Sequence, residues 1–247
     1  MALAHFGLSP QKAGAQTTEP NEANPDRVVA HLSSLPHGLA RLSPEDTAML
    51  SDVRQHSGAY SGAVSALLKL PGDEQQLEST PALNRIQNIL LIAQELGPEH
   101  GAGMVRDFYE QCSRSQRAAV STGRVIVPRS GPREPWLSNL LQMRRLALEV
   151  LGKLEDATQI NSVLDSLDSE DVATQVLMLQ YLGEVARGNA MVKARLSKMV
   201  KDQGTTLYRD GLALRILELL DRPKDESEAN DNERQGEKED SLDQQDP

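Results

Sequence analysis

Three short stretches of this chain repeat one apolar pattern, and that repeat constrains the fold more than any other feature of the sequence. The stretch LALEVLGKL begins at Leu146, LMLQYLGEV begins 31 residues later at Leu177, and LALRILELL begins at Leu212. Aligned on these leucines, four columns are apolar at helical spacing. The four columns are Leu148, Leu179 and Leu214; Val150, Tyr181 and Ile216; Leu151, Leu182 and Leu217; and Leu154, Val185 and Leu220. Apolar stripes this wide predict helices that each pack against several neighbours.

A second apolar segment follows each of the first two copies. Ile160, Leu164 and Leu167 recur 32 residues later as Val192, Leu196 and Met199. Each unit is therefore predicted to be a helical hairpin. A single hairpin cannot bury its stripes alone, so we expect successive hairpins to stack on one another.

The text MRRLALEVLGKLEDATQINSVLDSLDSEDVATQVLMLQYLGEVA, residues 143–186, resembles short HEAT repeats of the kind found in phycobilin lyases and bacterial scaffold proteins. Gly152 and Gly183 occupy equivalent places late in the first helix of each pair. The third copy has Glu218 at that place and follows after a spacing four residues longer, which suits a terminal unit. The resemblance covers residues 143–220 and implies a short α-solenoid with a binding role. No residue can be assigned a lyase function through it.

The remaining sequence predicts an all-α protein. Proline and capping residues mark helix starts upstream, and no paired segments alternate as the strands of a sheet would. Because Ala93 and Glu95 stand where the repeat has Leu148 and Val150, we expect an irregular helical N-terminal half. The predicted organisation is a disordered segment 1–26, a helical region 27–121, a loop 122–136, a HEAT-like region 137–220 and an acidic disordered tail 221–247.

Charge is concentrated at one end of the chain. The formal net charge is −10, and residues 221–247 supply −7 of it. Such a tail predicts a solvated segment, with an interaction arm or a nucleic-acid mimic as the alternative. The single cysteine, Cys112, is predicted to be a buried or inert thiol. With no secretory signal and no long apolar run, we expect a soluble cytoplasmic protein that does not enter membranes.

An arginine-rich segment is the strongest candidate for recognition. Residues 114–145 contain seven arginines, no lysine and one acid. Guanidinium groups pair bidentately with carboxylates and phosphates, and loops held by a rigid scaffold often carry function. Arg124, Arg129, Arg133 and Trp136 are therefore the predicted partner-binding residues. The arginines need not share a face, and they could instead pair with acids of the same chain.

Motifs for catalysis are missing from the sequence. The five histidines lie in the first 100 residues without metal-ligand spacing, and there is no GxSxG and no P-loop. We therefore predict a non-enzymatic adaptor, scaffold or regulatory subunit without a cofactor, binding a protein partner with acidic groups. The alternative is a nucleic-acid-associated HEAT-like protein, including a base-modifying enzyme, that binds through residues 114–145. The oligomeric state stays open.

Overall fold

The computed structural model of the chain describes residues 24–36, 38–122, 134–202 and 207–221. Within those ranges the protein is all-helical and contains no strand, which confirms the predicted all-α class. No helix in the described ranges combines the length and apolarity needed to cross a membrane.

Eleven α-helices make up the described ranges, and most begin where the sequence supplies a cap or a first-turn proline. Ser43, for example, caps its helix in a capping box with Asp46, and Pro44 follows at the first helical position. The α-helices are α1 Pro25–Ser33, α2 Pro44–Gln55, α3 Ser57–Leu67, α4 Glu74–Glu78, α5 Thr80–Glu95, α6 Gly97–Ser121, α7 Pro135–Lys153, α8 Ile160–Ser166, α9 Val172–Val185, α10 Ala190–Asp202 and α11 Leu207–Asp221. Short 3-10 turns occupy Gly38–Ala40, Ala157–Gln159 and Leu167–Ser169.

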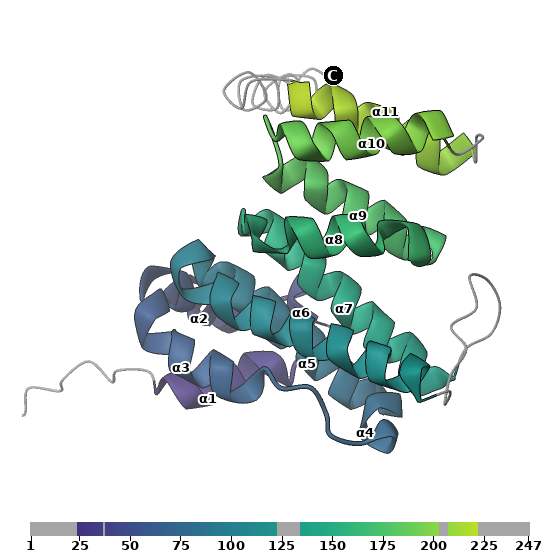
Figure 1. Ribbon diagram of the computed structural model, residues 1–247. Helices are drawn as coiled ribbons and strands as arrows, with labels where there is room; N and C mark the ends of the chain where they lie inside the picture. Colours follow the sequence, from purple (N-terminus) through teal and green to yellow (C-terminus); the bar gives the residue numbers. More distant parts are fainter. Residues whose placement is uncertain (1–23, 37, 123–133, 203–206, 222–247) are drawn as a thin grey trace, which may run out of the picture.

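Helices α7, α9 and α11 are the three copies of the repeated pattern, and they lie side by side in one layer (Figure 1). Helix α9 packs between α7 and α11, while α8 and α10 return along the other side. On the N-terminal side, α5 packs against α7 in the same manner, and α6 pairs with α7. The α5–α6 hairpin therefore packs directly on α7, although its sequence does not match the repeat columns. Helices α1 to α4 pack on α5 without that alternation, and α4 also packs on α7.

Burial follows the repeat columns. Leu148, Val150 and Leu151 of α7 are inaccessible to solvent, as are Leu179 and Leu182 of α9. Helix α11 departs from this pattern in two columns, because Leu214 is 50% exposed and Leu217 is only partly buried. In the described ranges α11 is the last helix of its layer, so nothing described packs beyond it.

Neighbouring helices of this layer approach closely at the two repeated glycines. A Cβ at Gly152 would overlap the Glu184 carboxylate and touch the Tyr181 ring of the next helix. A Cβ at Gly183 would lie 2.7 Å from Cδ1 of Ile216, again on the next helix. Tyr181 and Ile216 occupy the same column, so equivalent residues face the two glycines, although Tyr181 is farther from the Cβ placed on its glycine, at 3.7 Å.

Replacing Leu179 with Ala tests the predicted packing. Because Leu179 is completely buried between helices, we expect Leu179→Ala to lower the free energy of unfolding by about 2–5 kcal/mol. Leu214→Ala, in the same column but half exposed, should cost less than about 1 kcal/mol. Urea denaturation of both variants makes the comparison, and equal losses would contradict the burial pattern.

Substituting the glycines tests the close approach. Gly183→Ala should lower the free energy of unfolding by about 1 kcal/mol, because a methyl group there displaces the buried Ile216 side chain. Gly103→Ala is the control. Gly103 lies inside α6 with open space around it, so alanine should raise stability by about 0.5–1 kcal/mol. Stabilisation by both substitutions would show that the layer has room at Gly183.

Candidate functional site

Most of the predicted partner-binding residues are not in the described ranges. Arg124, Arg129 and Arg133 fall in residues 123–133, so their prediction stays a prediction. Trp136 is described, but it does not lie in a loop as predicted. Helix α7 begins at Pro135, which places Trp136 in its first turn.

Trp136 is partly buried and lines a small cavity of about 260 Å³. Its walls come from the segment before and within α4, the end of α6 and the start of α7; they include Leu70, Pro71, Leu77, Ala118 and Leu140. The ring thus contributes to the packing of three helices. A role in partner binding has no support from this position.

The described arginines of the 114–145 segment do not share a face. Arg114 lies exposed on α6, with a guanidinium nitrogen 3.6 Å from the Glu110 carboxylate, and Arg117 Nε donates to the Ser113 carbonyl. Arg145 on α7 instead turns to α9, where it contacts Asp171 at 2.7 Å and donates to the Thr174 hydroxyl. Arg145 therefore joins two helices of the same layer.

Arg144 is the most deeply buried of these arginines, at 4% exposure. Its guanidinium lies 2.5 Å from Glu170, donates to Gln116, and faces the Tyr109 ring at 5.9 Å from the centroid. Burial by itself lowers the pKa of Arg144, but the Glu170 carboxylate and Tyr109 outweigh it, so the pKa is raised. This arginine links α6, α7 and the turn before α9, and it has a structural partner already.

A buried ion pair gives a stability prediction. Arg144→Met removes the charge but keeps much of the volume, leaving the nearly buried Glu170 carboxylate without its guanidinium. We expect a loss of about 3–5 kcal/mol in the free energy of unfolding. Arg114→Met, at an exposed pair, should change it by less than about 1 kcal/mol. Thermal and urea denaturation would measure both, and a tolerated Arg144→Met would show that this pair is dispensable.

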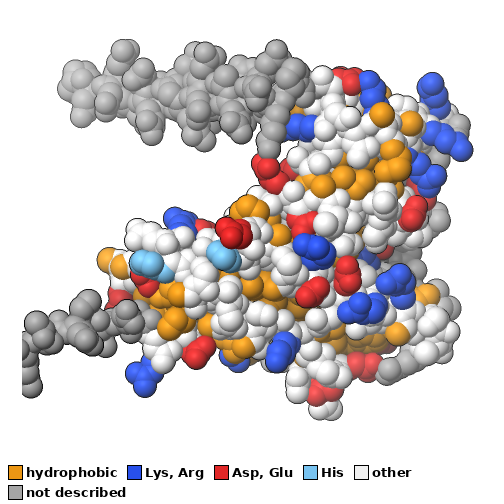
Figure 2. Space-filling model, turned by 60° about the vertical axis from the view of Figure 1, so that its left-hand side comes forward, with side chains coloured by type: hydrophobic (Ala, Val, Ile, Leu, Met, Phe, Trp, Pro, Cys, Tyr) orange, Lys and Arg blue, Asp and Glu red, His pale blue; other side chains and the backbone are white. Residues whose placement is uncertain are grey.

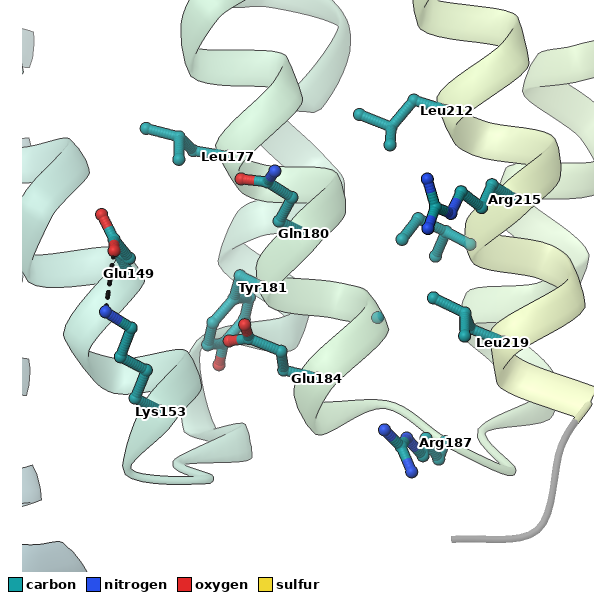
Figure 3. Close-up of a pocket in the computed structure, with 12 residues that line it drawn as sticks. Glu149, Lys153, Leu177, Gln180, Tyr181, Glu184, Arg187, Leu212, Arg215 and Leu219 are labelled. Atoms are coloured by element: carbon teal, nitrogen blue, oxygen red, sulfur yellow. Dashed lines mark hydrogen bonds and ion pairs between the residues drawn. The ribbon is translucent and has the colours of Figure 1, made fainter. Parts of the chain in front are cut away.

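A larger groove lies along α7, α9 and α11 (Figure 3). Its volume is about 540 Å³. Figure 2 shows the molecular surface recessed beside the C-terminal helices, with a band of hydrophobic side chains across them.

The groove is lined by equivalent columns of the repeat. Counted from the first leucine of each copy, every lining side chain of α7, α9 and α11 that points into the opening belongs to one of three columns. These are the first position, Leu177 and Leu212; the fourth, Glu149, Gln180 and Arg215; and the eighth, Lys153, Glu184 and Leu219. The fifth column, with Tyr181 and Ile216, forms the floor.

Charges in the groove are mixed. Lys153 Nζ contacts the Glu149 carboxylate at 2.9 Å across one helical turn. The pKa of Glu184 is raised, chiefly by burial. The nearby Lys153 and Arg187 oppose this increase, and the Glu149 carboxylate adds to it. With Arg187 and Arg215 included, three cations face two carboxylates. A surface with this balance suits contacts of both signs next to apolar side chains.

The groups most suggestive of catalysis have structural explanations. Ser43, Asp46 and His31 are linked, but the Ser43 hydroxyl donates to Asp46 rather than to the imidazole. The serine caps α2 and lacks the base that a nucleophile requires. Burial raises the pKa of Cys112 to about 12, so its thiolate is disfavoured at neutral pH. In the described ranges, no three potential ligands gather as a metal site.

Comparison with known proteins yields no match to any family model, curated protein or solved structure. The groove residues are thus the candidate site on geometry alone. Sequence reasoning missed them because each is an ordinary surface residue by itself. Reading the polar columns of the aligned repeat, next to the apolar ones, would have found them.

Proposed function

We propose that this chain is a non-enzymatic protein-interaction module whose partner binds in the groove of α7, α9 and α11. The observation that carries the proposal is the coincidence of the groove with three aligned columns of the repeat. One column presents partly buried leucines, Leu177 and Leu212, and another presents the polar set Glu149, Gln180 and Arg215.

Apolar anchors beside adjustable polar groups are typical of protein-binding surfaces. Successive helices in a repeat stack provide an extended surface for a helix or an extended peptide. Such a ligand could contact Leu177 and Leu212 together, since both lie along one groove. The partner is therefore proposed to be a segment with apolar side chains and at least one carboxylate, the latter facing Arg215.

We further propose that residues 143–220 form a short HEAT-like solenoid. Support comes from the equivalent glycine contacts, Gly152 with Tyr181 and Gly183 with Ile216. It also comes from the alternation of α7, α9 and α11 in one layer with α8 and α10 in the other.

The nucleic-acid alternative loses support from the described arginines. Arg144 and Arg145 pair with Glu170 and Asp171, so their charges are largely compensated within the chain. The groove itself is close to electrically balanced, whereas phosphate binding favours clustered cations. The remaining support for nucleic-acid binding comes from Arg124, Arg129 and Arg133.

The test begins with affinity capture of the full chain from its native cells, with and without nuclease, to identify a partner. That partner's Kd is then measured for Leu177→Ser/Leu212→Ser. We expect at least about tenfold weaker binding, the loss typical of hot-spot residues. A second pair, Gln180→Glu/Arg215→Glu, changes only exposed groove side chains and should weaken an acidic partner similarly.

Two controls make the outcome decisive. Leu214→Ser removes an exposed leucine from α11 outside the groove and should leave the Kd unchanged. Arg124→Ser/Arg129→Ser/Arg133→Ser tests the competing location. If both groove variants bind with full affinity and the arginine variant binds more weakly, the groove is not the binding site and the arginine-rich segment is.

A further inference from the structure

Helix α10 presents cations on its exposed side. Lys193, Arg195, Lys198 and Lys201 are all exposed, and the only acid of α10 is its last residue, Asp202. Figure 2 shows Lys and Arg side chains gathered along the upper right edge of the C-terminal helices. This surface lies apart from the groove, whose lining comes from α7, α9, α11 and the turn after α9.

Few described acids compensate these cations. Arg195 lies 3.9 Å from Asp168, at the limit of an ion pair, and both side chains are 40% exposed or more. Lys198 and Lys201 have no ion pair with any described residue. Exposed cations this close repel one another, so a neighbouring polyanion would be stabilised there.

The end of α11 brings the acidic part of the chain to this surface. Lys193 Nζ lies 2.5 Å from the carboxylate of Asp221, the last residue of α11. The turn before α10 is held there as well, because the Gly188 amide donates to the Leu220 carbonyl at 3.2 Å. The first acid of the predicted tail is therefore already paired with the first cation of α10.

The sequence after Asp221 has the opposite charge to the cationic surface of α10 and is long enough to cover it. Residues 222–247 hold ten acids and four bases, a net charge of −6. Helix α10 has 13 residues, so it is about 20 Å long. Extended chain advances about 3.3 Å per residue, so six or seven residues after Asp221 suffice to reach its far end.

We propose that the exposed face of α10 is an anion-binding surface whose occupant is the acidic segment 222–247 of the same chain. Each exposed ion pair contributes little alone. Covalent attachment raises the local concentration of carboxylates to the millimolar range, which favours many weak pairs together. Bound in this way, the segment shields α10 from other polyanions. This inference does not depend on the groove.

Carbodiimide cross-linking of the full chain tests the proposal, since this reagent joins a lysine amine directly to a carboxylate with loss of water. We expect mass spectrometry of the monomer band to find Lys198 and Lys201 joined to acids within 225–246. The yield should fall severalfold between about 0.05 M and 0.5 M salt, as the screening length shortens. Lys69, an exposed lysine in the N-terminal part, is the internal reference and should give few such links.

Two full-length variants test whether charge attraction causes the cross-links. Arg195→Glu/Lys198→Glu should abolish the links at Lys201 while helical content by circular dichroism is unchanged. Glu226→Gln/Glu228→Gln/Asp231→Asn/Glu233→Gln reduces the segment from −6 to −2. It should lower the links at Lys198 and Lys201, and it should also bind a fluorescein-labelled polyglutamate peptide more tightly than the wild type does.

Two results would overturn the proposal. Links at Lys198 and Lys201 no more frequent than those at Lys69 would show that the acidic segment does not occupy α10. Links confined to a dimer band would make the segment of a second copy the occupant.

Discussion

The close approach of α7, α9 and α11 sets the rest of the C-terminal architecture. Where Gly152 and Gly183 lack a side chain, Tyr181 and Ile216 of the next helix come into contact distance. Tyr181 also fixes the turn behind its layer, because its hydroxyl donates to the Asp156 carbonyl and accepts from the Gln159 amide. With the fifth column buried in this contact, the fourth and eighth columns must face the groove. One packing constraint thus determines both the core and the candidate site.

Helical periodicity predicted those features of the fold that depend on local sequence. The all-α class followed from the repeat and from capping residues, and the apolar columns of α7 and α9 are buried as expected, except that Val185 is only partly buried. Leu214 shows where such reasoning stops. Its sequence column is the same as that of Leu148 and Leu179, but its burial depends on whether another helix follows, and periodicity within one helix carries no information about that.

The candidate site was less predictable for a related reason. The arginine-rich segment is contiguous in sequence, but Arg144 and Arg145 turn inward on α7 toward Glu170 and Asp171, about 26 residues away in the chain. A charge count along the sequence cannot detect those partners. The groove is the reverse case, because Gln180 and Arg215 are 35 residues apart and become neighbours only when the repeats stack.

The salt dependence of binding distinguishes the two surfaces that the C-terminal helices present. In the groove, leucines lie beside carboxylates and cations in near balance, so contacts there depend mainly on burying apolar area and are weakly sensitive to screening. On α10, exposed cations attract an anion mainly by charge, and added salt weakens that attraction. Binding that survives high salt therefore points to the groove. Binding lost with salt points to α10, or to the arginines outside the described ranges, and charge reversal on α10 distinguishes these two.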